Sequence, residues 1–421
     1  EPTLSKLIHS LRLKGYLYAH ASQSKLIIDP AIKTATVQYH IILGPQIIAA
    51  PLKIKADGLS PDLIKRYMYF NAPQPYSLEW FEHARVNLLS SDYFKSVKLN
   101  THWKQMKHHT VPISVITLPK KSYSKLTGIG YDSDIGFKLL LGLRAHRLNA
   151  QGHRLQSIVA FSTRDTHFNL QYQIPGTNPV TDNWTIEITR QSHLDLNFAY
   201  SRYWLGRLEF KHLTENNMLR ISTNWKQETA SNTTQTHHLV YPELDLLKEF
   251  EFPRAHIDVP TKIKFKMMTR LGIPYQNNTH HYFNQWTLSL RARLPITTAH
   301  QLLISATTQK SFSHSLEDIP SSLQFAAGGM QSVRGYAYNS LGPAKNINLA
   351  TLEYRHQLTG LWYLATFMDM ANLHASLNGP WYRSAGVGLV WISPLASVSI
   401  NVARAIAQPT HPWRLQLSVY T

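Results

Sequence analysis

Hydrophobic and polar residues follow two different patterns along this chain, and the change falls near Ser122. Before it, apolar residues recur at the spacing of helices, between shorter strand-like runs. After it, apolar and polar residues alternate one by one, as they do on a strand whose two faces meet different surroundings. The pattern predicts an α+β region over residues 1–121 and an all-β region over residues 122–421.

The segment 48–121 shows a complete α+β module. A strand-like run at Leu52–Ala56 is followed by a helix start at Ser60, a residue type favoured as N-cap, with proline next to it. A second helix is predicted to open at Pro75-Tyr76-Ser77 and to pack through one face, formed by Leu78, Phe81, Ala84, Leu88 and Leu89. Two strands follow, at Phe94–Asn100 and Thr110–Leu118. The predicted order is strand, helix, helix, strand, strand.

Residues 1–47 resemble an incomplete copy of this module. The pattern predicts a helix at Leu4–Leu13 and strands at Tyr18–Ile28 and Thr34–Ile42. The first strand and first helix of the copy are missing. We therefore expect the sequence to begin part-way through a module.

The alternation after residue 122 is regular: Lys262, Lys264 and Lys266 stand between Ile263, Phe265 and Met267. A soluble β-sandwich would show the same alternation. However, the runs are often ten to thirteen residues long, whereas soluble strands cluster near about five or six. Tryptophan and tyrosine lie near their ends, as in membrane barrels. About sixteen strands in one sheet require closure in lipid, where an open edge would leave backbone groups unsatisfied.

Turn signals give approximate starts for roughly sixteen strands, and the sixth and seventh, around Gly206–Asn216, are the least well defined. The predicted starts are Ser124, Gly136, Gly152, Thr166, Asp182, His193, Asn217, Gln235, Asp258, His280, Ala299, Asn346, Leu361, Tyr382, Ala396 and Pro412.

Composition narrows the function classes. The chain has no cysteine, which excludes disulfide frameworks, thiolate nucleophiles and zinc–thiolate sites. Its net charge is +18, but the basic residues are dispersed, so we expect no nucleic-acid partner and favour contact with anionic lipid head groups. No run of apolar residues is long enough for a transmembrane helix. The sequence shows no catalytic motif, and no enzymatic activity or cofactor is expected.

Three pairs of adjacent histidines are candidate metal ligands: His108-His109, His237-His238 and His280-His281. Neighbouring residues on a strand point to opposite faces, so each pair would make a poor chelate. The sequence therefore predicts no metal site.

The alternation breaks for many residues between Phe312 and Asn346. This connection contains the string GGMQSVRGY, with Gly328, Gly329, Val333, Arg334, Gly335 and Tyr336. The string resembles the signature of loop six in the BamA/TamA superfamily of outer-membrane assembly barrels. We call residues 313–345 loop six. The resemblance implies that this loop folds into the barrel lumen and that Arg334 pairs with an inward-facing acid.

The matching strand motif is Phe367-Met368-Asp369, one barrel strand after Leu352-Glu353-Tyr354. Glu353 and Asp369 fall on the polar parity of their strands, which makes both carboxylates candidate partners of Arg334. An unpaired guanidinium in a lumen would be costly, and arginine can hold a carboxylate through two hydrogen bonds. The family usually has a glycine two residues after the aspartate, where this chain has Ala371.

The resemblance extends over the rest of the chain. Residues 126–134 are similar to the first barrel strand of the family and residues 386–394 to its third-from-last strand. The α+β region resembles polypeptide-transport-associated (POTRA) domains, partial over 1–47 and complete over 48–121. The resemblance implies a lateral seam between the first and last strands, formed by Gly128, Gly130, Trp413, Leu415, Leu417 and Val419.

The function implied by the resemblance is assembly of other membrane barrels. The chain is most similar to the TamA-type branch. That branch implies an outer-membrane location with the POTRA arm in the periplasm of a Gram-negative bacterium, a TamB-type inner-membrane-anchored partner, and unfolded autotransporters as substrates. Three alternatives remain open: a BamA-type general insertase, a two-partner secretion pore, and a passive porin or receptor.

Overall fold

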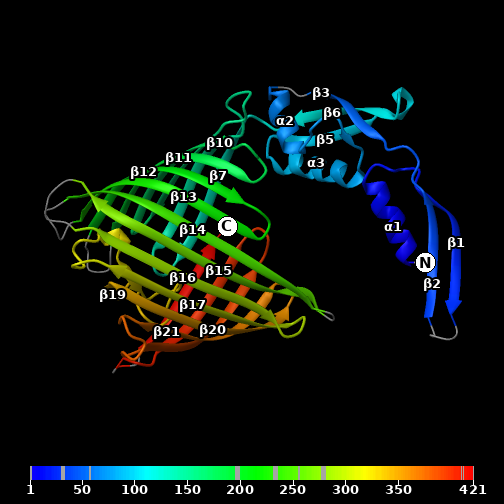
Figure 1. Cartoon of the computed structure of the whole chain (residues 1–421). Coiled ribbons are helices and arrows are strands. Elements are labelled where there is room, and N and C mark those ends of the chain that lie inside the picture. The colour runs from blue at the N-terminus through cyan, green and yellow to red at the C-terminus, as the bar shows by residue number, and fades with distance from the viewer. Residues whose placement is uncertain are drawn as a thin grey trace. The chain divides into compact units, whose positions relative to one another are not determined.

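The computed structural model describes residues 2–29, 34–55, 58–194, 200–230, 236–254, 257–275, 281–408, 410 and 412–420. Its architecture is an N-terminal α+β unit and a closed β-barrel (Figure 1). Among the described residues, no helix combines the length and apolar character needed to cross a bilayer.

The first 42 residues form α1 (Pro2–Leu13) and a two-stranded antiparallel sheet of β1 (His20–Asp29) and β2 (Thr34–Ile42). These three elements agree with the predicted helix and strand pair. Gly15, with φ +92°, ends the turn after α1, and its carbonyl accepts a hydrogen bond of 2.9 Å from the amide of Ile47.

The next elements keep the predicted order, except that a short strand, Gln74–Pro75, stands between the two helices. The second helix was predicted to open at Pro75-Tyr76-Ser77, but Pro75 lies in that strand and the helix begins at Leu78. The elements are β3 (Ile48–Lys55), α2 (Pro61–Met68), the short β4 (Gln74–Pro75), α3 (Leu78–Ser90), β5 (Phe94–Thr101) and β6 (Thr110–Pro119), and the four strands form one sheet in the order β4-β3-β6-β5. The sheet is mixed, because β3 pairs with β6 in parallel and β5 with β6 antiparallel. Ser60 and Ser77 cap the two helices, each side chain accepting from a backbone amide three residues on.

One hydrophobic core joins both helices to this sheet. It contains Leu63 and Met68 of α2, Ala84 and Leu88 of α3, and Val111 of β6, all fully buried. The predicted inner face of α3 is partly wrong, since the side chain of Leu78 is 59% exposed. Leu78 is the first residue of the helix, where the chain has not yet turned toward the sheet.

Two connections between barrel strands pack with the α+β region as one compact unit, which comprises residues 1–123, 145–154 and 175–180. The hydroxyl of Tyr93 donates a hydrogen bond of 2.5 Å to the carbonyl of Gly152, and the guanidinium of Arg154 lies 4.4 Å from the centre of the Tyr93 ring. The first stretch ends close to the predicted boundary at residue 122. The sequence pattern did not predict that residues 145–154 and 175–180, which connect barrel strands, pack with the α+β region.

The second unit is a closed barrel of 16 antiparallel strands (Figure 1). The strands are β7 (Tyr123–Asp132), β8 (Gly136–Ala145), β9 (Arg154–Ser162), β10 (Asp165–Pro175), β11 (Asp182–Leu194), β12 (Tyr200–Leu213), β13 (Asn217–Ala230), β14 (Thr236–Arg254), β15 (Ile257–Pro274), β16 (Phe283–Pro295), β17 (His300–Phe312), β20 (Asn346–Thr359), β21 (Trp362–Asn372), β22 (Tyr382–Ile392), β23 (Ser397–Ala405) and β24 (Trp413–Tyr420).

Burial on the barrel strands is inverted relative to a soluble protein. Trp184, Ile186 and Ile188 of β11 are 43%, 47% and 45% exposed, whereas Thr185 and Thr189, on the opposite face of the strand, are buried. Exposed apolar residues recur on the outside of strand after strand, and buried polar residues recur on the inside. A closed sheet that is apolar outside and polar inside suits a hydrocarbon surround. This pattern excludes the soluble sandwich left open by the alternation.

One predicted strand start is wrong. His193 lies near the end of β11, and β12 begins at Tyr200. β11 and β12 are 13 and 14 residues long, and alternation continues through both. The pattern alone therefore did not show where β11 ends and β12 begins. The predicted starts Gln235 and His280 lie outside the described residues, as does Ala56 of the first predicted strand.

Candidate functional site

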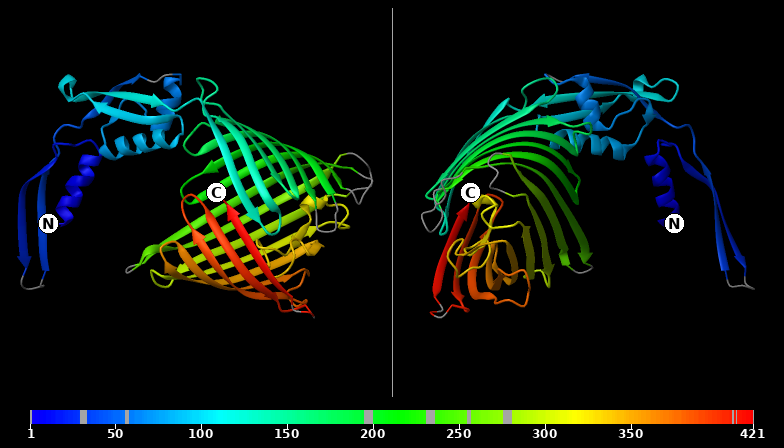
Figure 2. Two further views of the ribbon diagram at one scale, coloured as in Figure 1. Left: turned by 180° about the vertical axis from the view of Figure 1, so that it is seen from behind. Right: turned by 60° about the vertical axis from the view of Figure 1, so that its left-hand side comes forward.

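Loop six, between β17 and β20, lies within the ring of barrel strands (Figure 2). It contains the one-turn helix η2 (Ser321–Leu323) and a small hairpin of β18 (Phe325–Ala327) and β19 (Leu341–Ala344). The GGMQSVRGY string connects the two hairpin strands. The resemblance to loop six implied such an inward fold.

Arg334 is held by the two predicted carboxylates. Its Nε donates to Oδ2 of Asp369 at 2.8 Å and one terminal nitrogen donates to Oδ1 at 2.9 Å. The other terminal nitrogen donates to Oε2 of Glu353 at 2.6 Å. The backbone amide of Arg334 also donates to Asp369 at 3.0 Å. All three residues are buried, so the predicted lumenal ion pair is confirmed as a bidentate one with a second acid beside it.

Strand periodicity explains why the motif on β21 is Phe-x-Asp. Residues two apart on a strand face the same side, so Phe367 and Asp369 both point into the lumen. The guanidinium carbon of Arg334 lies 3.4 Å from the centre of the Phe367 ring. The arginine therefore meets a carboxylate at its edge and an aromatic face below it, both from one strand.

The neighbouring glycine permits the close approach of loop six to the barrel wall. Gly335 has φ +90°, and a β-carbon there would lie 3.2 Å from the backbone nitrogen of Ala405 on β23. Its amide donates to Oε1 of Gln416 on β24 at 3.3 Å. Gly328 and Gly329 also have positive φ, +109° and +90°. The predicted glycines thus serve the backbone path of the loop.

Apolar residues of the motif fill the space between loop and wall. Val333 and Tyr336 are fully buried in a cluster that also includes Ile347, Ala371 and Ala405. Ala371 occupies the position where the family usually has glycine, and it packs in this cluster without exposure. The structure thus brings Arg334 to both predicted acids and buries Val333 and Tyr336 in this cluster, whereas the predicted Gly329 lies beside Asp134.

A second attachment of loop six was missed by sequence reasoning. Glu228 on β13 is fully buried and accepts hydrogen bonds from the hydroxyl of Ser321 at 2.6 Å and the amide of Ser322 at 2.9 Å. Lys226, two residues earlier on the same strand, lies 3.1 Å from the same carboxylate and 3.8 Å from the centre of the Tyr203 ring. Only the lumenal parity of Glu228 was visible in the sequence.

Loop six also contacts both sides of the junction between the first and last barrel strands. The amide of Met330 donates to Oδ2 of Asp134, just beyond β7, at 2.6 Å. Gly335 contacts Gln416 on β24, as described above. Asp134 lies in the turn after β7 and Gln416 lies on β24, so loop six contacts both sides of the barrel closure. Neither residue was singled out in the sequence.

The junction itself is short. Among the described residues, β24 and β7 form three residue pairs, Ser418–Asp132, Val419–Tyr131 and Tyr420–Gly130, against eight between β23 and β24. One further backbone hydrogen bond of 2.9 Å runs from the amide of Ser133 to the carbonyl of Leu417.

The predicted seam residues divide unequally over this junction. Gly130 and Val419 lie in the ladder, whereas Gly128 lies on β7 before it and Trp413, Leu415 and Leu417 lie on β24 before it. Trp413 and Leu415 are 64% and 69% exposed on the outer face. The prediction therefore identified the correct strands, but the paired segment is limited to their last three residues.

The lumen beside loop six contains a cavity of about 780 Å³. Six basic and two acidic side chains line it: Lys262, Lys264, Arg291, Arg293, Arg334, Arg355, Glu353 and Asp369. Part of the large positive charge of the chain is thus gathered inside the barrel.

The predicted strand geometry of the histidine pairs is wrong for His108-His109. His108 and His109 have φ of +48° and +59° and lie in a turn, so alternation of strand faces does not apply to them. His237 and His238 do lie on strand β14. His280 is outside the described residues, but His281 is placed near two other ligand-type side chains.

Comparison with known proteins supports the geometric interpretation. The family model described as the Omp85 superfamily domain matches residues 147–417. The fold is similar to that of BamA from Haemophilus ducreyi lacking POTRA domains 1–3, with a TM-score of 0.74 at 15% identity over 99% of this chain and 92% of that one.

Two proteins of another type share the fold as well. CdiB from Escherichia coli has a TM-score of 0.63 at 14% identity, over 100% of this chain and 83% of that one. CdiB from Acinetobacter baumannii has a TM-score of 0.61 at 11% identity, over 98% and 79%. At these identities the likeness concerns the fold alone.

Proposed function

The chain belongs to the Omp85 superfamily, and we propose that it is an outer-membrane assembly factor that inserts other β-barrel proteins, autotransporters among them, through the seam between β7 and β24. The β-barrel proteins of this superfamily are outer-membrane proteins. The exposed apolar outside of this barrel and its polar lumen suit that location.

The short junction is the observation that carries this proposal. Alternate residue pairs of an antiparallel ladder exchange backbone hydrogen bonds, so a ladder of three pairs has fewer of them than the ladder of eight on the other side of β24. A strand edge that is little used by its neighbour can pair with an incoming strand. Substrate strands would therefore add to β7 while the barrel opens there.

Loop six fits a controlling role in such a mechanism. It is attached to β20 and β21 through Arg334, to β13 through Glu228, and to both sides of the seam through Asp134 and Gln416. A loop tied to the wall at these points resists widening of the junction. Opening would require the seam contacts to break while the two deeper attachments hold.

The N-terminal α+β unit fits the role of a periplasmic POTRA arm, complete over residues 48–121 and partial over 1–47. Its strand, helix, helix, strand, strand order supports this assignment. The sheet has β5 at one edge, where an extended partner segment could add as a further strand. A TamB-type inner-membrane-anchored protein would be the partner in the TamA-type role, and unfolded barrels would be the substrates.

A two-partner secretion pore is the second candidate, since two CdiB structures share the fold. That function needs a passage through the lumen, whereas insertion needs a lateral opening. Burial of Arg334 and Glu228 in loop-six contacts favours a lumen that stays occupied. The two candidates differ in whether activity survives when the seam is locked.

The decisive experiment locks the seam covalently. Tyr131→Cys and Val419→Cys place a cysteine pair at directly opposed positions, and the chain has no other cysteine. Opposed residues of an antiparallel pair have α-carbons within the reach of a disulfide. In liposomes we expect the oxidised variant to lose assembly of an unfolded barrel substrate, measured as protease-resistant product, and to regain it on reduction.

A matched pair in a long ladder supplies the control. Val387→Cys and Val402→Cys are likewise directly opposed and outward-facing, on β22 and β23. The oxidised control should assemble substrate at the wild-type rate. Wild-type assembly by the oxidised seam pair would reject lateral insertion, and continued export of a soluble secreted substrate by that variant would favour the pore.

Deleting the gene in its host and measuring surface display of autotransporters tests the TamA-type role separately, and unchanged display would reject it.

A further inference from the structure

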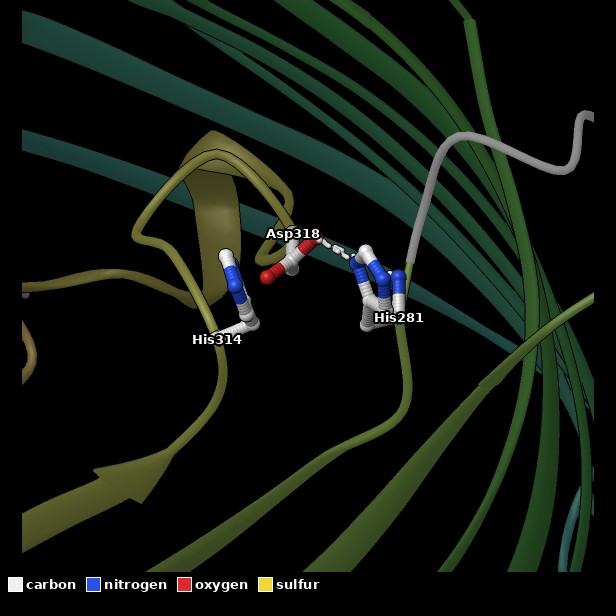
Figure 3. A group of neighbouring side chains, drawn as sticks. All are labelled: His281, His314 and Asp318. Carbon is white, nitrogen blue, oxygen red and sulfur yellow. Dashed lines mark hydrogen bonds and ion pairs between the residues drawn. The ribbon is translucent and has the colours of Figure 1, made fainter.

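Three side chains with metal-ligating atoms meet outside the loop-six attachments (Figure 3). His281 lies in the connection between β15 and β16, and His314 and Asp318 lie near the start of loop six. One ligand atom of each lies within 4.8 Å of the others. The three side chains point toward one another in Figure 3.

The carboxylate of this group is held in place by its surroundings. Asp318 is 4% exposed, and its Oδ2 accepts a hydrogen bond of 2.6 Å from the amide of Ser315. Its Oδ1 accepts from the amide of His281 at 3.2 Å. Hydrogen bonds from two backbone amides therefore fix the orientation of the carboxylate.

The imidazoles are accessible and free to adjust. The side chain of His281 is 62% exposed, and its ring stacks on that of His314 with centres 5.1 Å apart. Nδ1 of His281 lies 3.3 Å from Oδ1 of Asp318. In a tetrahedral zinc shell, with bonds of roughly 2.0–2.1 Å, ligand atoms are about 3.3 Å from each other. The first pair thus already has the spacing of two ligands, and rotation of His314 would bring in the third.

We propose that His281, His314 and Asp318 bind a divalent transition-metal ion of the Zn²⁺ class, with water as the fourth ligand. Two imidazoles and one carboxylate suit such ions, whereas Ca²⁺ and Mg²⁺ require shells of oxygen atoms. The bound ion ties the β15–β16 connection to loop six. It strengthens the contact that Asp318 of loop six already makes with His281.

Metal binding is measured on the untagged full chain in detergent micelles, dialysed against ZnCl₂ and analysed for bound zinc. Because the chain has 22 histidines, the quantity to compare is the difference between wild type and variants. We expect His281→Asn, His314→Asn and Asp318→Asn each to lose about one equivalent of tightly bound zinc. His374→Asn, an exposed histidine in the β21–β22 connection, is the matched control and should lose none.

Cobalt provides a readout that does not depend on the variants. Co²⁺ added to the wild-type chain should give the visible absorption bands of a four-coordinate site, and one equivalent of Zn²⁺ should abolish them. Zinc binding that is equal in wild type and all three variants, with the heat-modifiable mobility of a folded barrel, would overturn the proposal. Absence of four-coordinate Co²⁺ bands in the wild type would also overturn it.

Discussion

Gly386 on β22 lies directly opposite Phe367 on β21, and the absence of a β-carbon there leaves the space that the phenyl ring occupies. A β-carbon at Gly386 would fall 2.5 Å from Cζ of Phe367 and would overlap the carbonyl oxygen of Val402. Gly386→Ala is therefore expected to push the ring away from Arg334 and to destabilise the barrel by about 1–3 kcal/mol, the usual cost of overpacking. The measurement is the temperature at which heat-modifiable mobility on gels is lost.

Gly206→Ala is the matched control for this change. Gly206 also lies on a barrel strand, β12, but the nearest atom to its added β-carbon would be a ring carbon of Trp225 at 3.8 Å, an ordinary contact. Its transition temperature should stay near that of the wild type. An unchanged transition temperature in Gly386→Ala would contradict the prediction, because it would show that the Phe367 ring can move aside without loss of stability.

Arg334 is expected to dominate the stability of loop six. Arg334→Ala leaves the buried carboxylates of Glu353 and Asp369 without their main cation, and breaking a buried pair in this way costs about 3–5 kcal/mol. Arg334→Lys keeps the charge but cannot bond both acids in a planar fork, so it should recover part of the loss. Thermal unfolding and protease sensitivity of loop six are the measurements.

Arg355→Ala is the control for that series, because Arg355 contacts the other oxygen of Glu353 at 2.6 Å but lies outside loop six and is 23% exposed. Its effect should be clearly smaller. Equal losses in the two alanine variants would contradict the central place given to Arg334.

Much of the fold followed from the sequence because membrane barrels obey a strict two-residue period. Side-chain parity placed Glu353 and Asp369 in the lumen and Leu352 and Leu364 outside, and the exposures agree. The glycine and arginine spacing in loop six was recognisable because a backbone that must fold tightly against a wall admits few residue types. The strand count was likewise set by turn signals between alternating runs.

Contacts between distant segments could not be derived in the same way. Nothing local to Glu228 indicates that Ser321 and Ser322 will reach it, since that pairing depends on how loop six folds inside the barrel. His281 and His314 meet for the same reason. The short seam was also hidden, because ladder length depends on register and alternation fixes only which face a residue occupies.

Glu228 is expected to act as the second attachment of loop six. Glu228→Gln removes the charge that faces Lys226 and weakens acceptance of the bonds from Ser321 and Ser322. We expect a loss of about 1–3 kcal/mol, the cost of leaving a buried polar group poorly satisfied, and faster proteolysis within residues 313–345. Glu251→Gln is the control, because Glu251 is 44% exposed and pairs with Lys262 at 3.2 Å. Identical proteolysis rates in the two variants would reject the attachment.

Asp92 gives the α+β unit a defined pH dependence. Burial disfavours its charge, but the ammonium of Lys120 and the ring of His146, 2.8 Å away, outweigh burial and hold the pKa of Asp92 below its ordinary value. A carboxylate with a lowered pKa in the folded state stabilises at pH values above its unfolded pKa of about 3.9, and that stability is lost as pH falls through the folded value.

Asp92→Asn should therefore lower the unfolding temperature of this unit at pH 7. Unfolding is measured in the full chain by hydrogen exchange of β5 and of residues 145–154. The difference from wild type should shrink below about pH 4, as Asp92 of the wild type becomes protonated. Asp62→Asn is the control, since its pair with Arg66 spans 3.6 Å with the carboxylate 83% exposed, and such surface pairs contribute little. A difference that persisted unchanged to pH 3 would mean that the side chain acts through its shape, and the ion pairs with Lys120 and His146 would then contribute no stability.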